Sequence, residues 1–271
     1  MEIFGYVAAV FIGLILGLIG GGGSILTVPV LVYLFGVYPS LATGYSLFIV
    51  GTTSLFGIYS RWKLQEVNVR AALVFGLPSM LMVFATRRWI LPMIPNPIFS
   101  MHDWHLSKSH AMMLLFTVLM LLAAWNMLRP TIQNTIQRES GKSGTELLRF
   151  SLVIQGLVVG LLTGLVGVGG GFLIVPALVM FSKLPMKEAV GTSLLIIAVN
   201  SLLGFTGDVW TQGESMDLLF LVSITGLSIV GILLGGQLAK RIETTMLRKA
   251  FAWFVLLMGL VVSFKEITLI F

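Results

Sequence analysis

The chain consists of long apolar segments separated by short polar connections over its 271 residues. Most of the apolar segments have the length of a membrane-spanning helix, and none shows the ten-residue alternation typical of an outer-membrane barrel strand. Two segments, 25–35 and 172–181, are only about half as long as a bilayer is thick at roughly 1.5 Å per helical residue. The pattern predicts an all-α polytopic membrane protein that contains two half-length helices.

Composition supports a membrane location. Hydrophobic residues make up 57% of the chain and charged residues 10%, whereas soluble domains carry about 25% charged residues. The absence of cysteine excludes disulfides and thiolate chemistry. The net charge of +6 lies in short loops, where lysine and arginine mainly set orientation. We therefore expect the lipid bilayer, and no nucleic acid, as a partner. The N-terminus lacks the basic region of a cleaved signal peptide.

An internal repeat divides the chain. GLILGLIGGGGSILTVPVLV at 13–32 aligns without gaps on GLLTGLVGVGGGFLIVPALV at 160–179, an offset of 147. The alignment continues from ATGYSL at 42–47 to AVGTSL at 189–194. Glycines and a proline rarely match in this way by chance, so we interpret the repeat as a duplication. It predicts a first transmembrane repeat at 1–128, a cytoplasmic linker at 129–149 and a second repeat at 150–271.

The loop charges indicate how the repeats are oriented. Each repeat begins with an apolar segment that a glycine cluster interrupts, such as residues 3–35. If each of these broken elements crossed the membrane once, the repeats would be parallel, and Lys and Arg would divide almost evenly between the two sides. If each broken element enters and leaves on one side, the repeats are inverted, and thirteen of the 17 basic residues share a side. Only Arg87, Arg88, Lys108 and Lys265 then face the other. This asymmetry favours inverted repeats with both termini outside, whether or not residues 3–19 cross fully.

The paired glycine clusters suggest a binding site. A break in a helix frees backbone N–H groups at the start of the second piece, where the helix dipole favours an anion, and glycine lets the ligand approach the backbone. Inverted repeats with such breaks are typical of transporters that bind substrate near the midplane. The candidate substrate-binding residues are Gly22, Gly23, Ser24, Thr43, Ser46, Gly169, Gly170, Gly171, Thr192 and Ser193.

Each of these assignments has an alternative. Gly13, Gly17, Gly160 and Gly164 share a helix face and are expected to serve close helix packing alone. The hydroxyls of the TGYS (43–46) and GTS (191–193) segments could equally bond back to carbonyls of their own helix.

Other polar residues are weaker candidates. The segment HDWHLSKSH at 102–110 holds all three histidines; it could supply metal ligands, although an ordinary interfacial loop is favoured and we expect no metal site and no cofactor. Arg87 and Arg88 end an apolar segment, where we expect them to snorkel to the interface; drawing anions into an outer vestibule is the alternative. The spans offer no nucleophile–base pair, so an enzyme is not expected.

The two glycine motifs and the TGYS and GTS segments resemble the sulfite exporter TauE/SafE family of bacterial membrane proteins over nearly the whole chain. The resemblance implies transport of sulfite or an organosulfonate across the bacterial cytoplasmic membrane. It agrees with the anion expected at the glycine breaks. The prediction is a secondary transporter, specifically an exporter, that works by alternating access. A small-anion channel with the same site is the alternative, and a homo-oligomer is possible.

Overall fold

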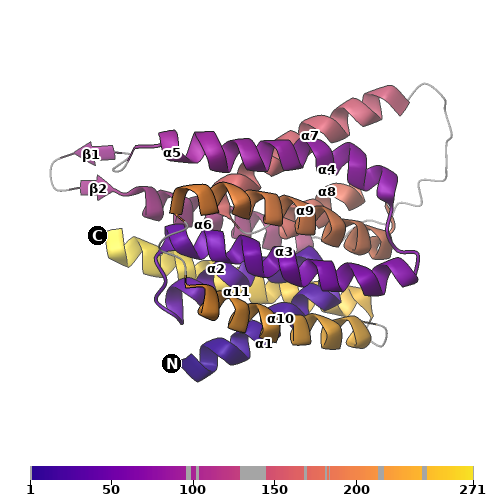
Figure 1. The fold of residues 1–271 in the computed structure, drawn as a ribbon, viewed down its shortest axis with the longest axis horizontal. Helices are drawn as coiled ribbons and strands as arrows, with labels where there is room; N and C mark the ends of the chain where they lie inside the picture. Colours follow the sequence, from indigo (N-terminus) through magenta and orange to yellow (C-terminus); the bar gives the residue numbers. More distant parts are fainter. Residues whose placement is uncertain are drawn as a thin grey trace.

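Helices make up most of the computed structural model, which describes residues 2–95, 99–101, 104–128, 145–167, 170–180, 182, 184–212, 217–239 and 243–270. The helices run along one long axis of the molecule (Figure 1). Within the described residues, four helices are long and apolar enough to cross a membrane: Pro39–Lys63, Val69–Met93, Met186–Val209 and Leu218–Leu238. The helical, multi-pass prediction is therefore confirmed at this level.

The elements follow the chain in this order: α1 (Glu2–Ile19), η1 (Gly21–Gly23), α2 (Ser24–Tyr33), α3 (Pro39–Lys63), α4 (Val69–Ala85), η2 (Thr86–Ile90), α5 (Leu91–Met93), β1 (Phe99–Met101), β2 (Trp104–Leu106), α6 (Lys108–Leu128), α7 (Thr145–Val166), α8 (Gly171–Met180), α9 (Met186–Gln212), α10 (Leu218–Leu238) and α11 (Thr244–Ile270). Strands β1 and β2 form a small antiparallel hairpin. The sequence did not predict this hairpin, since it lies in a stretch assigned to an irregular loop.

Helices α1 and α2 form a hairpin that turns at the first glycine cluster. Gly20 has a φ of +78°, a conformation that L side chains rarely adopt, and the 3-10 turn η1 follows it. A Cβ added at Gly23 would lie 2.5 Å from the Leu16 nitrogen, and the ring of Phe35 packs edge-on against that of Tyr6. Helix α2 therefore returns along α1 toward the end at which α1 begins.

The second glycine cluster makes a corresponding turn between α7 and α8. Gly167 and Gly170 have φ angles of +73° and +67°. The backbone of Gly170 lies against the hydroxyl of Thr163, one turn before the end of α7. Two short helices, α2 and α8, thus each begin at a glycine turn.

The first helix of each half packs on a helix of the other half. Helix α1 lies along α10, and α7 lies along α4. A Cβ at Gly13 would overlap the backbone oxygen of Ser228, and one at Gly160 would overlap that of Ser79. The backbones can approach this closely because glycine has no side chain. These contacts agree with the packing role expected for the glycines on this helix face.

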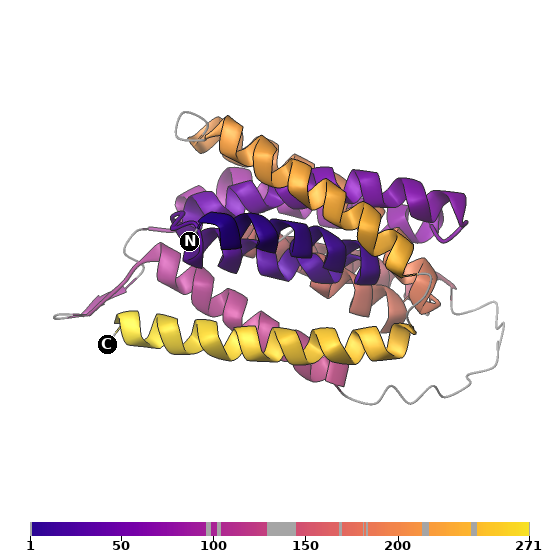
Figure 2. The same cartoon turned by 90° about the horizontal axis from the view of Figure 1, so that it is seen from below.

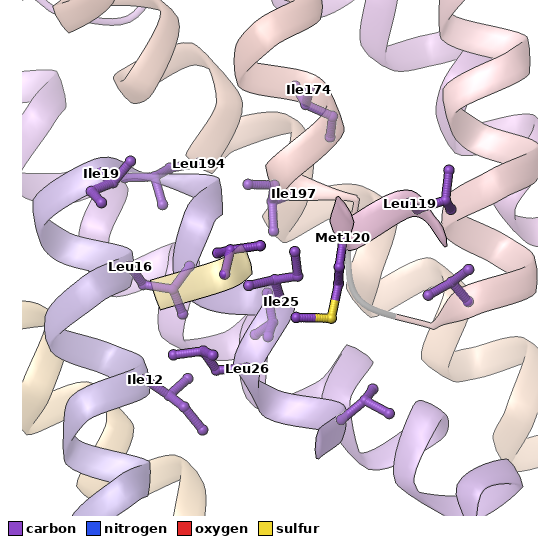
Figure 3. Packing of buried hydrophobic residues seen from close by; sticks show 14 of the residues in the cluster. Ile12, Leu16, Ile19, Ile25, Leu26, Leu119, Met120, Ile174, Leu194 and Ile197 are labelled. Carbon is purple, nitrogen blue, oxygen red and sulfur yellow. The ribbon is translucent and has the colours of Figure 1, made fainter. Parts of the chain in front are cut away.

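Helices α3 and α9 cross at the centre and run antiparallel. Gly51 lies against Leu202, Gly57 against Leu194, and Gly204 against Leu47. Residue numbers therefore increase along α3 in the direction in which they decrease along α9. Helices α6 and α11 pack together along one edge (Figure 2). The buried side chains form two hydrophobic clusters. In the larger one Ile25, Ile197 and Met120 converge from α2, α9 and α6 (Figure 3).

The connections divide between two ends of the bundle. Both termini lie at the end that carries the β1–β2 hairpin, and the connection from α3 to α4 lies at the opposite end (Figures 1 and 2). The chain thus begins and ends on one face of the bundle.

Candidate functional site

The two glycine turns touch one another inside the protein. A Cβ added at Gly21 would overlap the backbone of Gly171, and one at Gly171 would overlap the Cα of Gly21. Helices α2 and α8 begin at these two residues or within three positions of them. The first N–H groups of each short helix have no intrahelical partner and carry a partial positive charge. Two helix N-termini, one from each half, are therefore brought together without a side chain between them.

The structure brings most of the predicted glycines to this contact. Gly22 and Gly23 form η1, and Gly170 and Gly171 lead into α8. Gly169 lies outside the described residues. The added-Cβ contacts of Gly23 are with the backbone of α1, so this glycine also holds the hairpin closed.

The predicted hydroxyls mostly bond to their own helices. Ser24 donates to the Gly21 oxygen at 2.7 Å, Thr43 to the Ser40 oxygen at 2.8 Å, and Ser193 to the Val190 oxygen at 2.8 Å. Within the described part of the chain, Ser46 Oγ is buried without a hydrogen-bond partner.

Thr192 has a different role. Its hydroxyl accepts a hydrogen bond of 2.9 Å from the backbone nitrogen of Asn68. The bond joins the start of α9 to the start of α4. Among the candidate hydroxyls of Thr43, Ser46, Thr192 and Ser193, only that of Ser46 is without a hydrogen-bond partner within the described residues.

Arg87 is the most deeply buried charge in the described residues, and the expectation that it snorkels is wrong. It lies in the π-helical turn η2 that continues α4. Its Nη1 lies 2.8 Å from Asp208 Oδ2, and the two side chains are 1% and 3% exposed. The extra residue of a π-turn shifts the direction of the side chains that follow it. Arg87 is therefore buried against α9 and does not extend to the membrane interface.

The guanidinium of Arg87 reaches the second glycine turn. Nη1 also donates to Thr43 Oγ1 at 3.2 Å, and Nη2 lies directly against Gly167. Among the atoms that the structure describes, Arg87 Nε and Nη2 have no hydrogen-bond partner, and neither does the buried Thr163 Oγ1. A positively charged group with two uncommitted donors thus lies against the turn that leads into α8.

A second cation, Lys108, lies close enough to Arg87 for their charges to interact. Lys108 begins α6 and donates a hydrogen bond to the Leu91 oxygen. Burial, and next the positive charge of Arg87, lower the pKa of the Lys108 ammonium below its usual range. Two cations and the Asp208 carboxylate therefore share this region.

The other buried arginine of the described residues, Arg61, is bound differently from Arg87. Arg61 forms an ion pair of 2.7 Å with Glu66 and donates to the Gly17 oxygen at 3.1 Å. Beside it lies a cavity of about 270 Å³ between α1, α3 and α10, lined in part by Ser60 and Gly236. Both terminal nitrogens of Arg61, Nη1 and Nη2, therefore have hydrogen-bond partners within the protein.

The internal repeat marks the position of Asp208 in the sequence but does not identify its partner Arg87. Asp208 occupies the position of Arg61 at the repeat offset of 147, so each half places one charge at the same point of its third helix. The partner of Asp208 lies 121 positions away, and only the tertiary packing brings the two together. Of the histidine cluster, His102 and Asp103 lie outside the described residues, while His105 is in β2 and His110 in α6.

Comparison with known proteins places the chain in a family. Residues 6–262 match the family described as "Sulfite exporter TauE/SafE". A "Probable membrane transporter protein" of Xylella fastidiosa is 29% identical over 94% of this chain and 92% of its own length. YjnA of Bacillus subtilis is 28% identical (92% and 95%), and YunE of the same organism is 32% identical (73% and 76%); both are also named probable membrane transporter proteins. No solved structure gives a significant match. The chain belongs to the sulfite exporter TauE/SafE family of membrane transporters.

Proposed function

We propose that this protein is a secondary transporter that exports a small sulfur oxyanion, such as sulfite or an organosulfonate, across the bacterial cytoplasmic membrane. The anion binds where the glycine turns of the two halves meet, at the N-termini of α2 and α8. The contact between Gly21 and Gly171 is the observation that carries this proposal. It supports the proposal because two helix N-termini with partial positive charge lie close together, as expected for an anion site near the midplane of a transporter.

The proposed substrate class rests on two independent arguments. The helix N-termini favour a small anion of any kind. The family description names sulfite, whose oxygens can accept several backbone N–H bonds at once. In the proposed site Ser46, with its uncommitted hydroxyl, and the glycine backbone at 22–23 and 169–171 contribute donors, while Ser24, Thr43, Thr192 and Ser193 position the surrounding helices.

We propose that the two halves, 1–128 and 150–271, are inverted repeats. Helices α3 and α9 occupy equivalent places in the repeat and run antiparallel, which supports opposite insertion of the halves. With thirteen basic residues on one side, the α3–α4 connection and the 129–149 linker are assigned to the cytoplasm.

Alternating access fits the contact between the turns better than a channel does. With the backbones of Gly21 and Gly171 in direct contact, no anion can pass between them without a rearrangement. The cavity beside Arg61 lies at the end assigned to the cytoplasm. The described conformation is thus closed between the turns.

The test is transport by purified protein in liposomes. Uptake of sulfite, sulfoacetate, sulfate and taurine is measured with and without the same anion preloaded inside. We expect saturable uptake of sulfite or sulfoacetate that is accelerated by internal substrate, with taurine as the zwitterionic control. Unsaturable flux accompanied by electrical conductance would support the channel instead. No flux of any of the four would refute the proposed substrate class.

A further inference from the structure

We propose that Arg87 is the charged anchor of the transported anion. The Nε–Nη2 edge of its guanidinium binds an oxyanion at the second glycine turn, together with the Thr163 hydroxyl and the first N–H groups of α8. This inference rests on the proposed function and names the side chain that holds the substrate. The glycine motif alone supplies only backbone donors and does not assign this role.

The two edges of the guanidinium have different surroundings. Nη1 is committed to Asp208 and Thr43, at 2.8 and 3.2 Å. Nε and Nη2 are buried and, among the described atoms, unpartnered. The ion pair with Asp208 fixes the plane of the group, so the second edge is held in one direction, toward Gly167. A planar fork of this kind matches two oxygens of a sulfite or sulfonate group.

The energetics favour a ligand at this edge. A buried donor without a partner is strongly disfavoured, more so when it carries charge. Arg61 shows the alternative arrangement in the same protein: Glu66 and the Gly17 oxygen occupy its two terminal nitrogens. A purely structural Arg87 would be expected to be satisfied in the same way. Its uncommitted edge therefore points to an acceptor that comes from outside the chain.

Gly167 connects the glycine motif to this role. Its φ of +73° disfavours any side chain, and a Cβ there would overlap Arg87 Nη2 as well as Thr43. A residue larger than glycine would therefore displace the guanidinium from the turn. The glycine is required both for the turn and for the approach of the cation to the N-terminus of α8.

The test measures anion binding to purified protein by calorimetry, with sulfite and sulfoacetate as the probes and thermal unfolding as a parallel readout. Arg87→Gln removes the charge and the fork, and we expect binding to weaken about 10- to 100-fold. Arg87→Lys keeps the charge without the fork and should give an intermediate loss. Arg88→Gln is the matched control: it removes the same charge from the next position and should bind nearly as the wild type does.

A second variant separates binding from folding. Arg87→Gln removes the ion pair with the buried Asp208 carboxylate and is expected to lower stability. The double variant Arg87→Gln/Asp208→Asn removes both charges and should recover stability without recovering binding. If the double variant binds either anion as tightly as the wild type, or if Arg87→Gln does, Arg87 is not the anchor and the proposed function stands. If the wild type binds neither anion, the proposed function fails and the role of Arg87 falls with it.

Discussion

Gly231 and Gly226 lie on the same helix, α10, and offer a direct test of the packing between the halves. A Cβ at Gly231 would overlap the Val10 oxygen and lie 2.8 Å from the Leu14 nitrogen, whereas one at Gly226 would meet nothing within 4 Å. Gly231→Ala must therefore push α1 and α10 apart, on the order of 1 Å. A gap of that size forfeits up to about half of the dispersion energy of each atom pair involved.

The comparison of the two variants isolates this steric effect. Both substitutions gain the same helix propensity, about 1 kcal/mol in water, so it cancels in the difference. Overpacking of a close interface lowers stability by about 1–3 kcal/mol, and we expect Gly231→Ala to be less stable than Gly226→Ala by that amount. Reversible unfolding of the purified variants in mixed detergent measures it. Equal stabilities would refute the close approach of α1 to α10.

Three further predictions concern other parts of the molecule. Single cysteines introduced at Gln65 and Leu218, both exposed, should label from opposite sides of the membrane; labelling from one side would contradict the proposed topology. Ser79→Ala removes the 2.7 Å partner of Asn200 and should lower the free energy of unfolding by about 1–3 kcal/mol, measured by the same unfolding assay. Because burial lowers the pKa of Lys108, stability should rise as the pH increases from that lowered value toward about 10.5, the ordinary lysine pKa, and this rise should be smaller in Lys108→Gln.

The sequence predicted the features that depend on local pattern. The two half-length helices follow from apolar length and the turns before them from glycine spacing, because these determine where a helix can continue in a bilayer. For Thr43 and Ser193, the alternative that each bonds back to its own helix was the right one.

The sequence could not predict the environment of Arg87. An arginine at the end of an apolar run, followed by a second arginine, is typical of an interfacial residue. Its burial depends on the π-turn in η2 and on Asp208, which belongs to the other half. Periodicity along one helix contains no information about either. Gly23 shows the same limit: its close contact with the α1 backbone makes it a packing glycine as well as a candidate for binding.

The pairing of α1 with α10 has a consequence for biogenesis. Gly13 and Ser228, which meet at this interface, are 215 positions apart in the chain. When α1 first enters the membrane, its partner has not yet been synthesised, and its glycine face must remain against lipid or the insertion machinery until α10 arrives. The first half cannot reach its final packing during translation, because contacts this distant in sequence form late. A ribosome that stalls before α10 would release a chain whose opening helix has no partner, and membrane quality-control proteases could recognise it by that exposed face.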